Sequence, residues 1–159
     1  MNLYDDATLL KRVPMFSKLD NAKLKLLAFT SRSVAFVDGE FICRRDDSSD
    51  CAYVIMEGQV EILAENDDGE LRPVVVRGVN ELVGEMAVLN NTPRSATMRA
   101  VGALRVLCID NDDFVALISE NPLVALDVMR QLSAKLSESH SYVEELLAEV
   151  SSAGKRTKM

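Results

Sequence analysis

The sequence predicts an α+β fold in which helices flank an antiparallel β barrel or sandwich. The middle of the chain carries short runs of β-branched and aromatic residues separated by turn residues, which is typical of antiparallel strands. Both ends instead carry apolar residues at helical spacing. At 159 residues and 48% hydrophobic, the chain is long enough to bury one substantial core and short for two ordinary domains.

Helices are expected first, at about residues 5–30, with a break at Pro14. Asp20 is expected to cap the second helix, because its side-chain oxygen can accept a hydrogen bond from an amide in the first turn. The apolar positions that define these helices are Leu9, Leu10, Val13, Leu19, Leu24, Leu26, Leu27 and Phe29.

Residues from about 33 to 110 carry the β pattern. The runs expected as strands are SVAFV, EFICR, AYVIM, VEILAE, PVVVR, SATMRAV and LRVLCI. The turns expected between them fall at Asp38-Gly39, 46–50, Glu57-Gly58, 67–69, Gly78 and Gly102. Asp68-Gly69 predicts a hairpin between VEILAE and PVVVR, because glycine tolerates the positive φ that such a turn needs.

The C-terminal third is expected to be helical, with a short segment at 110–118 and a long one that begins at Asn121-Pro122. Residues at alternating spacings of four and three, all apolar except Ser139, form a heptad seam, made of Ala125, Met129, Leu132, Leu136, Ser139, Val143, Leu146 and Val150. A helix of about 29 residues is roughly 43 Å long. It could pack on its own domain, but its length favours a two-stranded coiled coil.

The expected organisation is therefore residues 1–120 for the helices and barrel, 121–150 for the long helix and 151–159 for a disordered basic tail. The net charge of −7 argues against nucleic-acid binding, and the basic cluster Lys155, Arg156 and Lys158 is confined to that tail. No apolar run approaches the ~20 residues that span a membrane, and the N-terminus does not look like a secretory signal. The irregularly spaced Cys43, Cys51 and Cys108 suggest neither disulfides nor zinc. A cytoplasmic protein with reduced, packed cysteines is expected.

The segment LVGEMAVLNNTPRSAT at 82–97 concentrates the polar chemistry. If 84–89 form a helical turn, the first amides, at Glu85, Met86 and Ala87, are free to bind an anion. Gly84 lets a ligand approach the backbone, since it has no Cβ. Arg94 could bring a guanidinium fork to the same anion.

Glu85 is an acceptor when ionised, so its natural partner beside an anion site is a hydroxyl. Together with apolar walls from Val74, Val83 and Met86, these groups describe a nucleotide or sugar-phosphate pocket. The residues alone leave an alternative open. Glu85 and Arg94 could instead form a structural ion pair that closes a loop.

This segment resembles the phosphate-binding cassette of cyclic nucleotide-binding domains. The pattern in that family is Gly-Glu, small and apolar residues, a turn, then Pro-Arg-Ser/Thr/Ala-Ala-Thr, and this chain reads GEMAVL at 84–89 and PRSAT at 93–97. LLKRVPMFSKL at 9–19, DGEFI at 38–42 and AYVIMEGQVEI at 52–62 also resemble the family, so the likeness covers about residues 8–145.

The resemblance implies an antiparallel β-roll or jelly-roll barrel of the catabolite-activator type. It would have N-terminal helices, a short phosphate-cassette helix and a long C-terminal dimerisation helix. The cassette glutamate of the family binds the ribose 2′-hydroxyl, which gives Glu85 that role, and its arginine pairs with the cyclic phosphate, which gives Arg94 that one. The backbone groups that would complete the cradle belong to Gly84, Met86, Ala87, Ser95 and Ala96.

Two positions depart from the family pattern. Val83 stands where phenylalanine often precedes Gly-Glu, and Arg45 replaces an expected glycine in the first loop. Neither position is one of the phosphate or ribose contacts, so the ligand assignment is kept.

The choice of base is less constrained. Many cGMP-selective members have threonine after the cassette arginine, whereas this chain has Ser95, as do the bacterial cAMP-dependent activators. The resemblance therefore favours cAMP, with cGMP as the alternative. A Thr-Ser pair that contacts adenine in those activators falls here at Ser139 and His140, although His140 could equally be a solvent-facing helix residue.

The activators continue into a helix-turn-helix domain, whereas this sequence ends at AEVSSAGKRTKM, so DNA binding is not expected. The expected function is a stand-alone second-messenger receptor that pairs as a homodimer through its long helix and signals to an effector protein, or else the regulatory piece of a larger protein. An enzyme is not expected, because one histidine and scattered acids supply neither metal ligands nor a general base. A coiled-coil adaptor with a non-functional pocket is the alternative from another class.

Overall fold

A computed structural model describes the backbone of residues 3–157 and the side chains of residues 7–152. The chain divides into two compact units, one ending at Ala125 and one beginning at Leu126, and each is described by itself. The elements, in order, are α1 (Leu3–Lys11), the 3-10 helix η1 (Pro14–Phe16), α2 (Asn21–Thr30), β1 (Arg32–Phe36), β2 (Phe41–Cys43), β3 (Cys51–Glu65), β4 (Leu71–Arg77), β5 (Leu82–Val83), α3 (Glu85–Asn90), β6 (Thr97–Asp110), α4 (Asn111–Glu120) and α5 (Pro122–Thr157).

The N-terminal helices confirm the sequence prediction. The chain leaves α1 and enters the short 3-10 helix at Pro14, whose ring suits a first helical position. Asp20 caps α2 as expected, since its Oδ1 accepts a hydrogen bond of 2.9 Å from the amide of Lys23.

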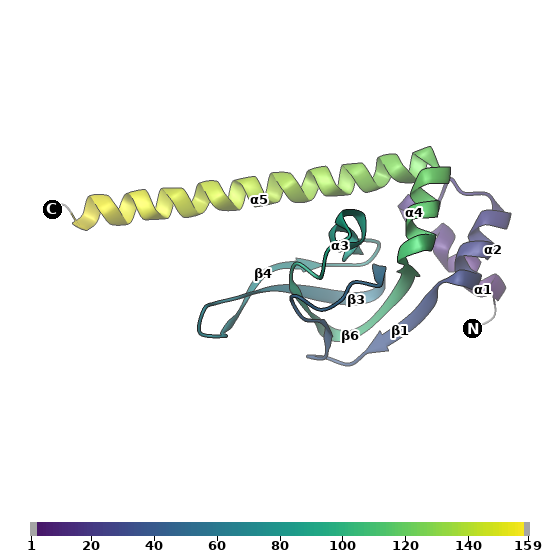
Figure 1. The fold of residues 1–159 in the computed structure, drawn as a ribbon, viewed down its shortest axis with the longest axis horizontal. Coiled ribbons are helices and arrows are strands. Elements are labelled where there is room, and N and C mark those ends of the chain that lie inside the picture. Colours follow the sequence, from purple (N-terminus) through teal and green to yellow (C-terminus); the bar gives the residue numbers. More distant parts are fainter. Residues whose placement is uncertain (1–2, 158–159) are drawn as a thin grey trace. The chain divides into compact units, whose positions relative to one another are not determined.

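The strands form one antiparallel sheet in which β1, β6, β3 and β4 are neighbours in that order. Two short strands complete it, β2 on β6 and β5 on β3. Figure 1 shows α1, α2 and α4 gathered at one end of these strands. The α+β class and the roll of strands with a short helix are thus confirmed.

The long strands β3 and β6 differ from the prediction. The glycines at 58 and 102 were expected as turns, but both lie inside continuous strands. Gly58 has φ +87°, and a Cβ on it would overlap the carbonyl oxygen of Ala103 on β6. The pairing of β3 with β6 shifts register at this point, so the glycine forms a bulge that bends the pair instead of ending it.

The predicted hairpin between β3 and β4 is present. The amide of Gly69, at φ +83°, donates to the carbonyl of Asn66 at 2.9 Å, and the amide of Asn66 donates to Glu70 at 2.8 Å. This turn needs the positive φ that glycine supplies without strain.

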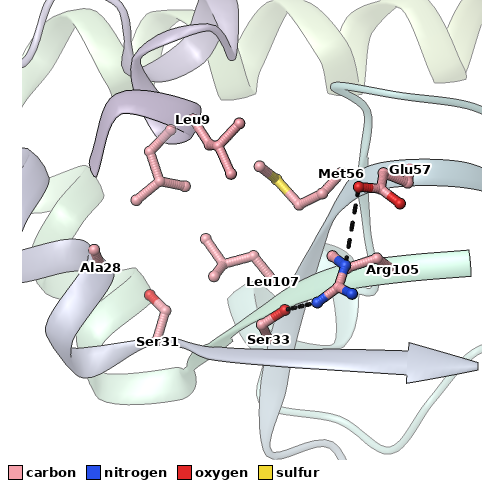
Figure 2. Close-up of a pocket in the computed structure, with 9 residues that line it drawn as sticks. Leu9, Ala28, Ser31, Ser33, Met56, Glu57, Arg105 and Leu107 are labelled. Atoms are coloured by element: carbon pink, nitrogen blue, oxygen red, sulfur yellow. Dashed lines mark hydrogen bonds and ion pairs between the residues drawn. The ribbon is translucent and has the colours of Figure 1, made fainter. Parts of the chain in front are cut away.

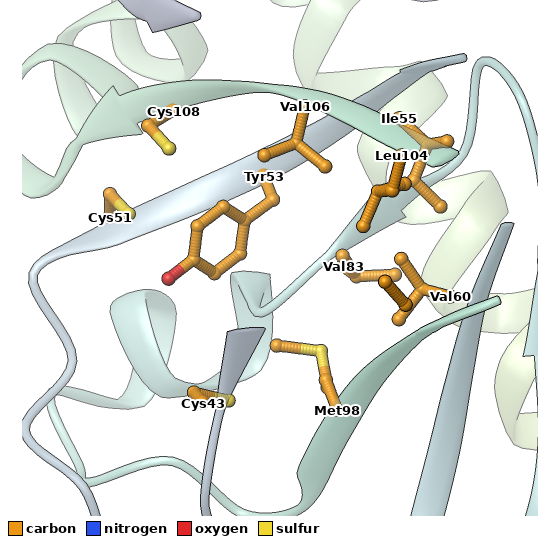
Figure 3. Close-up of a cluster of buried hydrophobic side chains, with 11 residues drawn as sticks. Cys43, Cys51, Tyr53, Ile55, Val60, Val83, Met98, Leu104, Val106 and Cys108 are labelled. Carbon is orange, nitrogen blue, oxygen red and sulfur yellow. The ribbon is translucent and has the colours of Figure 1, made fainter. Parts of the chain in front are cut away.

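The interior of the sheet is a cluster of buried side chains, and it includes all three cysteines (Figure 3). Each cysteine is unpaired and buried, as the sequence suggested. Tyr53 lies in the same cluster and carries the one phenol in it.

Helix α5 makes up most of the second unit. It continues to Thr157, past the end expected near Val150, so disorder from residue 151 is wrong for residues 151–157; residues 158 and 159 lie outside the described part. The seam residues Met129, Leu136, Val143 and Val150 are 50–72% exposed. Among residues 3–157, no helix combines the length and apolar character that crossing a bilayer requires.

Candidate functional site

Buried polar chemistry is concentrated in one segment of the chain. Among the side chains of residues 7–152, the polar or charged ones that are fully buried are Glu85, Arg94 and Thr97, each 2–3% exposed. Burying a charged group costs free energy unless partners compensate for lost solvation. Two opposite charges buried within ten residues therefore mark residues 84–97, the cassette, as the candidate site.

The cassette helix α3 begins where the sequence placed it. Strand β5 pairs with Tyr53 and Val54 of β3, and Gly84, at φ +77°, then turns the chain into α3. Gly84 caps the helix without a side chain, so no cap side chain takes the first-turn amides. Glu85 is the first helical residue and is buried.

Arg94 returns to the beginning of α3 from the other end of the cassette. Its Nη1 donates a hydrogen bond of 3.0 Å to the carbonyl of Gly84, and its Nη2 donates one of 2.6 Å to the carbonyl of Cys51. The carboxylate of Asp50 lies 3.9 Å from Nη2. The guanidinium is thereby fixed beside the first turn of α3.

The ring of Tyr53 contacts the same guanidinium. The Arg94 Cζ atom lies 4.8 Å from the centre of the Tyr53 ring, a cation–π arrangement. Burial raises the pKa of Tyr53, so its phenol stays neutral and does not cancel the charge of Arg94.

Glycine is required at position 84 for a steric reason as well as for its backbone conformation. A Cβ built on Gly84 would overlap the Nη1 atom of Arg94 and approach Cδ2 of Tyr53 to 3.2 Å. The close approach of arginine and backbone therefore requires glycine.

The loop at 44–50 holds the far end of the cassette. The amide of Arg94 donates to the carbonyl of Asp47 at 2.8 Å, and the amide of Asp46 donates to the carbonyl of Arg94 at 2.9 Å. The amide of Arg45 donates to Thr97 Oγ1 at 3.0 Å. Arg45, where the family pattern has glycine, thus contributes its backbone to this junction.

The structure brings most of the predicted site residues together. Val83 and Ala87 are buried beside the glycine and the helix, whereas Met86 is 44% exposed. Ser95 is exposed, and the carbonyl of Ala96 accepts a hydrogen bond of 3.6 Å from the Cys43 thiol.

Three predicted residues belong to other elements than the cassette. Val74 is 46% exposed and sits where the register of β4 shifts against the Val60–Glu65 half of β3, whereas the cassette strand pairs with Tyr53 and Val54. Ser139 and His140 belong to the second unit, where His140 Nε2 lies 3.0 Å from Glu144 Oε1 one turn along α5.

Three contributors, Asp50, Cys51 and Tyr53, had no signal in the sequence. They reach Arg94 across a separation of about 40 residues through sheet pairing, and an inward-facing tyrosine in AYVIM looks like any other core residue.

Two further features bear on what else the protein could hold. Among the described residues, no group of three or more histidine, cysteine or acidic side chains could bind a metal ion. A separate, mainly apolar hollow of about 80 Å³ lies between the N-terminal helices and the sheet, with Arg105 at its rim (Figure 2). Arg105 Nη1 donates to Ser33 at 3.1 Å there. The residues that line the hollow all lie outside the cassette, so the two are distinct.

Comparison with known proteins points to one family. The sequence pattern of the family described as "Cyclic nucleotide-binding domain" matches residues 33–121. The chain is 32% identical over 117 residues to a cyclic nucleotide-gated potassium channel of Rhizobium etli, covering 74% of this chain and 31% of the channel. It is 30% identical to the cAMP-dependent protein kinase regulatory subunit of Blastocladiella emersonii, covering 77% and 29% respectively.

The fold has relatives among solved structures. The catabolite activator protein of Thermus thermophilus superposes with a TM-score of 0.71 and 28% identity, over 84% of this chain and 62% of that one. The chain thus spans less than a third of the two curated relatives, and less than two thirds of the activator.

Proposed function

Because this chain belongs to the cyclic nucleotide-binding domain family, we propose that it is a cAMP receptor that regulates a partner protein and catalyses no reaction. One observation carries the proposal. The buried guanidinium of Arg94 is fixed beside the first turn of α3, and the buried carboxylate of Glu85 begins that turn. A small ligand that carries both an anion and a hydroxyl could bind Arg94 through the anion and Glu85 through the hydroxyl.

The phosphate end of the ligand is assigned to Arg94. Its guanidinium carries a full charge in a site 3% exposed, where little water screens it, and a planar fork matches two phosphate oxygens. The backbone of Gly84, Met86 and Ala87 supplies the first-turn amides, which favour an anion for the same electrostatic reason. Ser95 and Ala96 are proposed to complete the cradle.

The ribose end is assigned to Glu85. An ionised carboxylate only accepts hydrogen bonds, so the ligand group beside it must donate. The 2′-hydroxyl of a ribose with a 3′,5′-cyclic phosphate is such a donor, whereas a second phosphate oxygen would be repelled.

The base is proposed to be adenine, with guanine as the alternative. Ser95 is exposed, and its hydroxyl could bind either base, but the Blastocladiella relative is the regulatory subunit of a cAMP-dependent protein kinase. Val83 and Met86, with Val74 of β4, are proposed as apolar walls for the nucleoside. Ser139 and His140 are proposed base contacts from α5.

Signalling is proposed to run through α5. Most of its seam residues are exposed in the single chain, which suits pairing with a second copy of the helix. Such pairing buries apolar side chains at heptad spacing. Nucleotide that binds one pairing geometry better than another would shift that equilibrium, and an effector protein would detect the change.

The test is titration calorimetry on protein stripped of nucleotide by unfolding and refolding. cAMP, cGMP and linear 5′-AMP are titrated in parallel. Tight cAMP binding with weaker cGMP and no 5′-AMP binding supports the proposal, and a cGMP preference replaces the base assignment. No heat with either cyclic nucleotide overturns the receptor function in favour of a coiled-coil adaptor.

A further inference from the structure

Two of the buried cysteines are neighbours across the two central strands. Strand β3 pairs with β6 so that Cys51 faces Asp110 and Tyr53 faces Cys108. Cys51 and Cys108 are therefore diagonal neighbours on the same face of the sheet. Figure 3 shows both side chains in the cluster beside the Tyr53 ring, and the two thiols hydrogen-bond to each other.

The two thiols differ in acidity from each other and from Cys43. The hydrogen bond from Cys108 lowers the pKa of Cys51 against the opposing effect of burial, and the same bond raises the pKa of Cys108. Burial is the main cause that raises the pKa of Cys43 to about 11. Cys51 is thus the first of the three to become a thiolate, the form that reacts with oxidants.

Cys51 also touches the arginine of the cassette. Its carbonyl accepts the 2.6 Å hydrogen bond from Arg94 Nη2, and its sulfur lies 3.7 Å from the same nitrogen. Any change in the position of Cys51 is therefore transmitted to Arg94 through a direct contact.

We propose that Cys51 and Cys108 are a redox modification site, which a peroxide converts into an intrachain disulfide that loosens the hold of Cys51 on Arg94. Three observations support this site: the pairing register of β3 with β6, the burial of both cysteines, and the contact of Cys51 with Arg94. Cys51 is 2% and Cys108 4% exposed, so the oxidant must be small, and hydrogen peroxide is close to water in size.

The chemistry balances in two steps. The Cys51 thiolate attacks one peroxide oxygen, the O–O bond breaks, and the products are a Cys51 sulfenic acid and, after protonation, one water. The Cys108 sulfur then attacks the sulfur of the sulfenic acid, and its proton leaves with the hydroxyl as a second water. Two thiols lose two electrons, and one peroxide is reduced to two waters.

Closing the bond must move the beginning of β3. A disulfide brings its Cβ atoms to about 3.5–4.5 Å, whereas diagonal neighbours in an antiparallel pair have Cα atoms ~7–8 Å apart and Cβ atoms somewhat closer. The main chain at Cys51 therefore has to shift toward β6, and its carbonyl shifts with it. A bond formed under such strain is readily reduced, which suits reversible control.

The test treats reduced, nucleotide-free protein with hydrogen peroxide, blocks the remaining thiols under denaturing conditions and maps the peptides by mass spectrometry. We expect a 51–108 link that dithiothreitol reverses. Cys43→Ser should still form it, whereas Cys108→Ser should stop at an oxidised Cys51. A link that involves Cys43, or no link in the wild-type protein, would overturn the proposal.

Two readouts measure the effect on Arg94. Hydrogen exchange of the 82–94 peptide, without nucleotide, should speed up on oxidation and recover on reduction; unchanged exchange in linked protein would contradict the coupling. The second readout relies on the proposed function: linked protein should bind cAMP about tenfold more weakly, as expected for one impaired hydrogen bond to a charged group. If reduced protein binds no cAMP, only the proposed function fails, because mapping and exchange need no nucleotide.

Discussion

The Arg94 guanidinium donates a 3.0 Å hydrogen bond to the carbonyl oxygen of Gly84, ten residues earlier in the chain. The cation is therefore held at the beginning of α3. Together with the Cys51 carbonyl and the Tyr53 ring, this contact fixes the side chain within the protein. A preorganised group loses less conformational entropy on binding, so its charge contributes more to affinity.

Gly84→Ala tests this relationship. The new methyl group would overlap Arg94 Nη1 and displace the guanidinium, so we expect the affinity for cAMP to fall at least about tenfold, the value of one hydrogen bond to a charged group. Calorimetry of the refolded variant measures the loss.

Gly69→Ala is the matched control. Gly69 has φ +83°, close to the +77° of Gly84, but a Cβ there meets nothing within 4 Å. Both variants should lose about 1–2 kcal/mol of stability from the left-handed backbone, and only Gly84→Ala should lose affinity. Equal affinities in the two variants would rule out the steric account of Gly84.

Glu85→Gln tests the ribose contact. The amide keeps the shape of the side chain but removes its charge, so discrimination between cAMP and 2′-deoxy-cAMP should shrink. In the wild-type protein the 2′-hydroxyl should be worth about 1.5–3 kcal/mol, as for hydrogen bonds to charged groups.

The comparison for Glu85 is Glu61→Gln, which removes a carboxylate that pairs with Arg99 at 2.8 Å on another part of the sheet. This variant should discriminate between the two nucleotides as the wild-type protein does. If Glu85→Gln discriminates between cAMP and 2′-deoxy-cAMP as well as the wild-type protein does, another group binds the 2′-hydroxyl.

Local sequence patterns predicted the elements that depend on local chemistry. Pro14, the Asp20 cap and the Asp68-Gly69 hairpin were readable because each acts on residues within a few positions. Gly58 was misread as a turn because its positive φ serves a bulge, and only the approach of Ala103 from β6 distinguishes the two uses.

The candidate site was predictable in its charged residues and not in their support. Glu85 and Arg94 stand in a specific motif, whereas Cys51, Tyr53 and Asp50 reach Arg94 through pairing of distant strands. Whether Ser139 and His140 contribute stays a prediction, because they lie in the second unit.

Gly58→Ala should destabilise the protein more than Gly39→Ala. Both positions have φ above +80°, but a Cβ on Gly58 meets the backbone of Ala103, which cannot move aside as a side chain can, while Gly39 faces open space. The difference should be about 1–3 kcal/mol, as for other overpacked sites. Urea unfolding measures it, and equal midpoints would contradict the bulge.

Leu136→Asp should weaken self-association through α5. Leu136 is a seam residue and is 72% exposed in the single chain, so a charge there would be buried in a paired coil. Sedimentation velocity should show a shift toward monomer, while Ala134→Asp, on an exposed position outside the seam, should leave the dimer intact. A wild-type protein that stays monomeric at high concentration would remove the dimer from the proposal.

The central claim is that Arg94 binds the cyclic phosphate, and cAMP titration of Arg94→Ala beside Arg99→Ala tests it most directly. Arg99 pairs with Glu61 in the sheet, so its variant loses the same side chain away from the cassette. The account predicts a loss of about 2–5 kcal/mol in binding free energy for Arg94→Ala and little change for Arg99→Ala, with Arg94→Lys in between. If Arg94→Ala binds cAMP as tightly as Arg99→Ala, the phosphate is not bound by this residue and the assignment of the cassette is wrong.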